Sequence, residues 1–197
     1  IIFASSAGVY GQARTMPILE DTPFMPENPY AITKATSEYY IKYFCKEYNI
    51  DFTILRYGNV FGPRDTVASD HVITVFTDAL LNGTQPVIHW DGEQKKDFVF
   101  VEDVASANLC AIDNGNNYVF NIANGIPKTI NDIYEKVCQE LNIFIKPNYT
   151  PKRKGDVKEA YFNIECAIKH LKWMPKINFD IGIKETLDWY KSRYKAN

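Results

Sequence analysis

The stretch IIFASSAGVYG, residues 1–11, decides the fold of this chain. It begins with a short apolar run, continues through two serines, and ends in a loop that contains Gly8 and Gly11. An apolar run of this length, bounded by small polar residues, is typical of a buried strand in a parallel sheet. Ligands of α/β folds bind beyond the carboxyl ends of such strands. We therefore predict that the hydroxyl of Ser6 faces a binding crevice.

The remaining sequence alternates predicted helices with predicted strands. Helical patterns cover residues 30–48, 71–81 and 104–113, another helix opens at Thr129, and two more lie within 163–194. Strand patterns cover residues 51–57, 87–90, 97–101 and 118–122, and a turn around Asp91-Gly92 joins the second of these to the third. This alternation predicts an α/β fold with a mostly parallel sheet.

Tyr30 and Lys34 stand at the start of the first predicted helix, directly after Asn28-Pro29. Their spacing places both side chains on one helix face, and Pro29 suits the first helical position. A tyrosine hydroxyl holds its proton too tightly to be a base near neutral pH, but a nearby ammonium stabilises the phenolate. Such a pair can take a proton from a sugar hydroxyl. A tyrosine and a lysine four residues apart on a helix are more often half-buried packing residues with solvated tips than a catalytic pair. The neighbouring motifs must therefore decide between the two interpretations.

Two motifs supply that context, Ser5-Ser6-Ala7-Gly8-Val9-Tyr10-Gly11 and Pro29-Tyr30-Ala31-Ile32-Thr33-Lys34. In order and separation they resemble the extended short-chain dehydrogenases/reductases, in the branch of nucleotide-sugar epimerases and dehydratases. The resemblance implies that Tyr30 is the general base and acid, and that Lys34 assists it and holds the nicotinamide ribose of NAD. It implies that Ser6 is the hydroxyl on the substrate side. Ser5 is the alternative if the register differs by one, and we group it with Tyr30 and Lys34 on the cofactor side.

The resemblance also implies the domain organisation. Residues 1–60 would be the remainder of a dinucleotide-binding Rossmann domain with the catalytic motif. Residues 61–197 would be mainly a smaller α/β substrate-binding region, with some segments returning to the Rossmann sheet. The sequence contains no Gly-x-x-Gly-x-x-Gly turn for the pyrophosphate of NAD. By the family pattern, the expected fold is the C-terminal part of a Rossmann-type parallel sheet, and its open edge would invite pairing.

Four residues are predicted on the substrate side by the same resemblance. Asn59, in Leu55-Arg56-Tyr57-Gly58-Asn59-Val60-Phe61-Gly62-Pro63-Arg64, would contact the diphosphate of a nucleotide sugar. Lys96 stands where the family has Arg, and it offers charge without a planar fork. Arg153, in Lys152-Arg153-Lys154-Gly155-Asp156, would clamp the diphosphate, with Lys154 in place of the usual Pro. Ala160 would leave space beside the C2 substituent for an N-acetyl group. Trp90, where Gly is usual, indicates a reshaped hairpin.

The leading interpretation is an NAD-dependent 4-epimerase that acts on UDP-glucose/galactose or a UDP-N-acetylhexosamine. A 4,6-dehydratase is disfavoured because Ala7-Gly8 occupies the place of that group's acidic pair. A decarboxylase or a reductase stays open. An alternative of another class is a truncated, inactive fragment that binds a nucleotide sugar or a partner. Aromatic residues along helix 30–48 predict a homodimer of the full-length protein.

Composition excludes several other classes. The formal net charge is −2, so no general basic field exists for nucleic acid. The four cysteines are scattered and form no Cys-x-x-Cys or Cys/His cluster, which argues against a structural zinc site and favours reduced, mostly buried thiols. The sequence shows neither a membrane-length apolar run nor a signal peptide. We predict a cytoplasmic protein without membrane or nucleic-acid partners.

Overall fold

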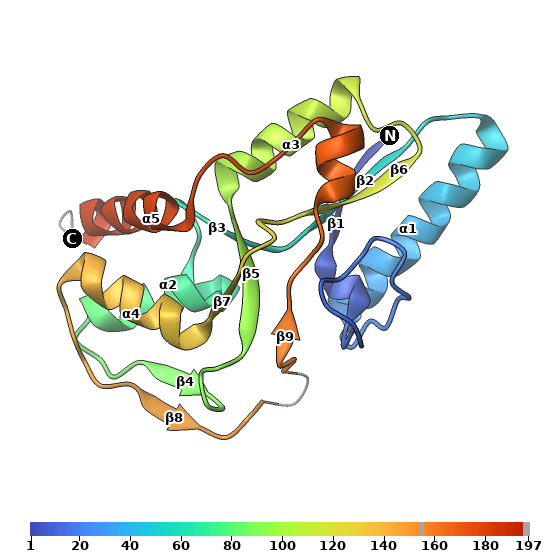
Figure 1. Cartoon of the computed structure of the whole chain (residues 1–197). Helices are drawn as coiled ribbons and strands as arrows, with labels where there is room; N and C mark the ends of the chain where they lie inside the picture. The colour runs from blue at the N-terminus through green and yellow to red at the C-terminus, as the bar shows by residue number, and fades with distance from the viewer. Residues whose placement is uncertain (154–155, 195–197) are drawn as a thin grey trace.

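Three parallel strands form the sheet that the opening stretch predicts. The computed structural model describes residues 1–153 and 156–194, and Figure 1 shows its course. Strands β1 (Ile2–Ser6), β2 (Thr53–Tyr57) and β6 (Tyr118–Ile122) pair in the order β1-β2-β6. The register places Ser6 beside Tyr57, and Tyr57 beside Ile122. The carboxyl ends of all three strands therefore meet at one edge.

Two helices cover the two faces of this sheet. Helices α1 (Pro29–Tyr48) and α3 (Val101–Asp113) lie on different sides of it in Figure 1. Arg56 of β2 binds Glu38 of α1, whereas its neighbour Leu55 belongs to the core that contains Val104 of α3. Because successive strand residues point to opposite faces, α1 and α3 must cover opposite faces.

The start of β1 departs from the prediction of a buried strand. Ile1 and Ile2 are 57% and 43% exposed. Within the described residues β1 pairs only with β2, so it forms the edge of the sheet and its first side chains are covered on one side only. Burial begins at Ser5, where α1 packs against the strand.

The second part of the chain gathers around β5 (Lys95–Phe100). This strand pairs with β3 (Asn59–Phe61) and β9 (Glu159–Ala160) in parallel and with β7 (Pro127–Thr129) in antiparallel orientation. Gly58 separates β3 from β2. A Cβ there would lie 3.3 Å from the Cβ of Ala123, so glycine permits the close approach.

The predicted hairpin between residues 87–90 and 97–101 is wrong. Strand β4 (Val87–His89) pairs with β8 (Asn148–Thr150) instead of β5. Both sides of β5 are already occupied by other strands, which leaves no position for β4. Trp90 and Gly92, with φ of +66° and +76°, turn the chain from one pair to the other. Trp90 lies under two ammonium groups, from Lys152 at 4.2 Å and Lys158 at 4.7 Å from the ring centre.

Helices α2 (Val72–Leu81), α4 (Ile130–Leu141) and α5 (Phe179–Tyr194) enclose the core of this second part. Aromatic and aliphatic side chains fill it, among them Phe61, Phe76, Phe98, Phe100 and Leu187. The predicted start of α4 is confirmed, because Thr129 caps it through a capping box with Asp132. Helix α3 begins three residues earlier than predicted. The tail contains a π-helix η3 (Ala167–Leu171) before α5, and short 3-10 helices η1 (Ala7–Tyr10) and η2 (Val67–Ser69) lie in loops.

The state of the cysteines and the length of the helices complete the description of the fold. Cys45 and Cys138 are buried, Cys110 and Cys166 are half-buried, and all four thiols are free. None of the helices in the described ranges is long and apolar enough to span a membrane.

Candidate active site

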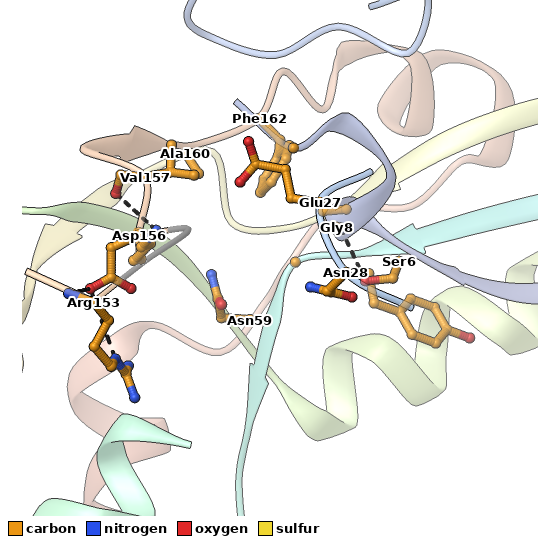
Figure 2. Close-up of a pocket in the computed structure, with 15 residues that line it drawn as sticks. Ser6, Gly8, Glu27, Asn28, Asn59, Arg153, Asp156, Val157, Ala160 and Phe162 are labelled. Carbon is orange, nitrogen blue, oxygen red and sulfur yellow. Dashed lines mark hydrogen bonds and ion pairs between the residues drawn. The ribbon is translucent and has the colours of Figure 1, made fainter. Parts of the chain in front are cut away.

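Two adjoining cavities open at the carboxyl edge of the sheet. Their volumes are about 540 and 460 Å³. Six residues line both of them: Ser6, Tyr57, Gly58, Asn59, Lys96 and Arg153. Figure 2 shows the first cavity, with Ser6 and Asn28 on one side and Arg153 and Asp156 across from them. The two cavities therefore form one continuous site between the sheet and the second part of the chain.

The start of α1 presents Tyr30 to the second cavity. The Asn28 side chain accepts a hydrogen bond from the Ala31 N–H at 2.8 Å, and Pro29 occupies the first turn. These two features begin the helix at a defined residue. Tyr30 lines the second cavity with Ser5 and Ser6, and it is 58% exposed. The phenol is thus held on a rigid element and stays accessible to a ligand.

Lys34 lies behind Tyr30 and does not line either cavity. Its Nζ donates to the Ala4 carbonyl at 2.8 Å and lies 5.7 Å from the centre of the Tyr30 ring. An ammonium has three N–H donors, so two remain after the Ala4 contact. Lys34 therefore joins α1 to β1 beside the phenol.

The structure separates the roles of the two adjacent serines. Ser6 lines both cavities, and its Oγ accepts a hydrogen bond from the Gly8 N–H at 3.1 Å. Ser5 is 2% exposed, and its hydroxyl donates to Glu38 Oε1 at 2.6 Å. Because neighbouring strand residues alternate in direction, only one of the two hydroxyls can point fully into the site, and that one is Ser6.

A buried polar network behind the site was missed by the sequence reasoning. Arg56 donates through Nε and Nη2 to the two carboxylate oxygens of Glu38, at 2.9 and 2.6 Å. Its Nη1 donates to the Tyr10 hydroxyl at 2.8 Å, and that hydroxyl donates to Asn121 Oδ1. Burial raises the pKa of Tyr10, so it remains a donor. The network ties α1, β1, β2 and β6 together immediately behind Ser6.

The predicted substrate-side residues converge on the first cavity. Asn59, Lys96, Arg153 and Ala160 all line it. Asn59 Nδ2 donates to the Asp97 carbonyl at 2.9 Å, and Lys96 Nζ donates to the Val157 carbonyl at 3.1 Å. Burial lowers the pKa of Lys96, an effect that the carboxylate of Asp156 opposes.

Arg153 is held by two carboxylates. Its Nη1 lies 3.2 Å from Asp70 Oδ2, and its Nε lies 3.8 Å from Asp156 Oδ2. Both pairs are open to solvent, so each is worth less than about 1 kcal/mol, and an anionic ligand can compete for the guanidinium. Lys154, predicted to alter this turn, lies outside the described residues.

Asp97 joins three segments beneath the site. Its carboxylate accepts hydrogen bonds from the backbone N–H groups of Asn124, Gly125 and Phe162 at 2.8 to 3.3 Å. The side chain is completely buried, and burial raises its pKa to about 6. Because its carbonyl also holds Asn59, this residue couples the floor of the site to the fold.

The raised pKa of Asp97 predicts a pH-dependent contribution to stability. Its value of about 6 lies above the ordinary 3.8, so the contribution is fully present below pH 3.8 and is lost as the pH rises through 6. Asp97→Asn cannot titrate, so the difference in unfolding free energy between wild type and variant should shrink from pH 4 to pH 7. Urea unfolding at each pH measures this. A difference that stays constant, as expected for the exposed control Asp113→Asn, would contradict the prediction.

Several cavity residues carried no clear sequence signal. Glu27 and Tyr57 line the first cavity, and His71 lines the second. His71 Nδ1 lies 2.8 Å from Asp65 Oδ2, which also accepts from Thr74. These residues follow no local spacing rule, because the loops that carry them come together only in the folded chain.

Taken together, the fold and the site define an α/β protein that presents a tyrosine, a serine and two cations to a ligand at the end of a parallel sheet. The chain belongs to the NAD dependent epimerase/dehydratase family, whose sequence profile matches residues 1–123. The predicted family membership and Rossmann-type fold are thereby confirmed. Members of this family depend on NAD.

Several individual relatives within this family are similar to the chain. A Methanocaldococcus jannaschii protein, provisionally named UDP-glucose 4-epimerase, is 39% identical over the whole chain. The UDP-glucose 4-epimerase of Thermotoga maritima, solved with UDP-glucose, is 36% identical with a TM-score of 0.94 over 98% of the chain. The UDP-N-acetylglucosamine 4-epimerase of Methanobrevibacter ruminantium, in complex with UDP-N-acetylmuramic acid, is 39% identical with a TM-score of 0.93 over 98% of the chain. The chain spans 63 to 64% of the length of these proteins.

The residues present fit one end of NAD. Tyr30 and Ser6 line the site, and Lys34 keeps two donors for the hydroxyls of a ribose. These groups suit the nicotinamide riboside. The 197 residues contain no glycine-rich turn that would approach the pyrophosphate.

Proposed function

We propose that this chain supplies the catalytic site of an NAD-dependent 4-epimerase acting on UDP-glucose/galactose or a UDP-N-acetylhexosamine. The observation that carries the proposal is one continuous site whose walls include Tyr30 and Ser6 as well as the cationic side chains of Lys96 and Arg153. This arrangement suits an uncharged reacting centre attached to a diphosphate. The similarity to sugar 4-epimerases supports the reaction type.

In this proposal the side chains around the sugar move the proton of its C4 hydroxyl. Tyr30 takes the proton from the C4 hydroxyl, Ser6 hydrogen-bonds the same oxygen, and Lys34 stabilises the charge that develops on the phenol. Bound NAD would supply the acceptor and donor for the hydride that leaves and returns to C4. Tyr30 keeps the proton while the 4-keto sugar turns its other face toward the hydride donor. It can therefore return the proton to the C4 oxygen afterwards. The product is the C4 epimer.

The diphosphate is assigned to the two cationic side chains of the site. Lys96 supplies a partly buried ammonium, and Arg153 supplies a guanidinium whose exposed partners are readily displaced. Charge-assisted hydrogen bonds are the strong contacts for phosphate oxygens. Asn59 lines both cavities and can contact the diphosphate through the part of its amide that Asp97 leaves free. Ala160 leaves open space in the first cavity, which suits an N-acetyl group.

A second candidate is binding of a nucleotide sugar without catalysis. Hydride chemistry requires bound NAD, so a chain that binds the nucleotide sugar but no NAD would bind it without turnover. The exposed aromatic residues of α1, Tyr39, Tyr40, Tyr43 and Tyr48, support a homodimer interface as a further proposal. A monomeric mass in sedimentation would count against that interface.

One experiment separates the two candidates. The purified chain is denatured and the supernatant is assayed for released NAD, and the native chain is then incubated with UDP-glucose and added NAD. We expect bound or readily acquired NAD and formation of UDP-galactose. Binding of UDP without NAD uptake or turnover would support the non-catalytic alternative. Failure to bind UDP would contradict both.

A further inference from the structure

The cationic and the acidic side chains lie on different sides of the first cavity. Lys96 and Arg153 line both cavities, whereas Glu27 and Ala160 line only the first. Figure 2 shows the Glu27 carboxylate directed into this cavity beside Ala160 and Phe162, with Arg153 on the far side. Glu27 precedes Tyr30 by three residues on the loop that enters α1. Its carboxylate therefore lies on the sugar side of the site.

Glu27 differs from the other carboxylates that line the two cavities. Asp156 and Asp70 pair with Arg153, and Asp65 accepts hydrogen bonds from His71 and Thr74. Glu27 has no hydrogen bond or ion pair with any described residue. Glu27 therefore presents carboxylate oxygens that are free to accept hydrogen bonds, with no cationic partner among the described residues, to whatever occupies the cavity.

We propose that Glu27 determines sugar specificity, accepting neutral hexoses and rejecting hexuronates. The proposal rests on the proposed nucleotide-sugar function. With the diphosphate at Lys96 and Arg153, the sugar ring extends toward Ser6 and Glu27. Hydroxyl groups of a neutral hexose donate to the Glu27 oxygens, whereas a uronate would bring a second negative charge close to the first.

The size of the effect follows from the distance and the solvent exposure. The carboxylates of Glu27 and of a bound uronate would lie about as far apart as two groups in direct contact. In a cavity open to water, their repulsion should weaken binding of the uronate by about tenfold. The repulsion is electrostatic, so added salt should reduce it. A neutral amide at position 27 keeps the shape and removes the charge.

Calorimetric titration with UDP, UDP-glucose and UDP-glucuronate tests the proposal on the wild-type chain and on Glu27→Gln. The wild type should bind UDP-glucose about tenfold more tightly than UDP-glucuronate. In Glu27→Gln the two affinities should converge, chiefly through tighter binding of UDP-glucuronate, while the affinity for UDP stays unchanged. Glu47→Gln, an exposed glutamate on α1 away from the cavities, is the matched control.

Each other outcome has a definite meaning. Equal affinities of the wild type for the two sugars, or an unchanged preference in Glu27→Gln, would overturn the proposal while UDP binding keeps the proposed function intact. Absence of UDP binding by the wild type would overturn the proposed function and this proposal together. A loss of stability in Glu27→Gln with an unchanged preference would mean that Glu27 only supports the start of α1.

Discussion

Replacing Arg56 by Met is expected to lower the free energy of unfolding by about 3 to 5 kcal/mol. Arg56 and Glu38 are a fully buried ion pair, with side-chain exposures of 2% and 0% and an N–O distance of 2.6 Å. Removing the guanidinium leaves the buried Glu38 carboxylate with only the partly exposed ammonium of Lys42, 3.9 Å away, as a cationic partner. Breaking a buried pair in this way is among the most costly single changes in a protein. The packing of the guanidinium between the Tyr10 and Phe24 rings is lost as well.

Urea unfolding followed by circular dichroism measures this loss. Arg14→Met, at an exposed arginine, is the matched control and should change stability by less than about 0.5 kcal/mol. The double variant Arg56→Met with Glu38→Leu should lose less than the sum of the two single variants, since no unpaired charge remains. Additive losses would show that the two side chains act independently and would contradict the ion-pair argument.

Replacing Tyr30 by Phe should lower turnover of UDP-glucose by about 10² to 10⁴-fold, under the proposed function. The substitution removes only the hydroxyl that is proposed to exchange a proton with the C4 hydroxyl of the sugar. Tyr30 is exposed at the start of α1, and its hydroxyl makes no hydrogen bond within the described residues, so the fold should be unaffected. The affinity for UDP should also be unchanged, because the diphosphate is assigned to Lys96 and Arg153 and not to the Tyr30 hydroxyl.

Turnover with added NAD, the affinity for UDP and the unfolding free energy are measured on the same preparations. Tyr40→Phe on the same helix is the control, because it loses an equally exposed hydroxyl outside the cavities. Turnover that persists in Tyr30→Phe would remove this residue from the chemistry. A parallel loss in Tyr40→Phe would point to an effect on assembly instead of proton transfer.

Local patterns predicted most of the regular structure. The helix at 30–48, the strand at 118–122 and the helix opened by Thr129 depend on capping and periodicity within a few residues, and the structure confirms them. The pairing of β4 and the exposure of Ile1 depend on which segments become neighbours. Short strands such as β3, β7 and β9 carry too few residues for a period to be recognised.

The site residues divide in the same way, into those that local sequence patterns indicated and those that only the folded chain brought together. Tyr30 and Lys34 could be singled out because a helix turns a spacing of four residues into a common face. Ser5 and Ser6 are chemically identical, and only the hydrogen bond to Glu38 decides that Ser5 is buried at the second cavity while Ser6 lines both cavities. Glu27 and His71 became candidates only when loops from distant parts of the sequence met at the cavities.

The sequence by itself determined the fold class and the family, and it singled out Tyr30 and Lys34 as the proposed catalytic pair, because these depend on short motifs whose geometry is local. Tertiary structure alone decided the partner of Arg56, the direction of each serine and the opposite placement of Glu27 and Arg153. The physical reason is that burial and electrostatic environment are properties of contacts between distant residues. Such contacts exist only after the strands and loops have packed together.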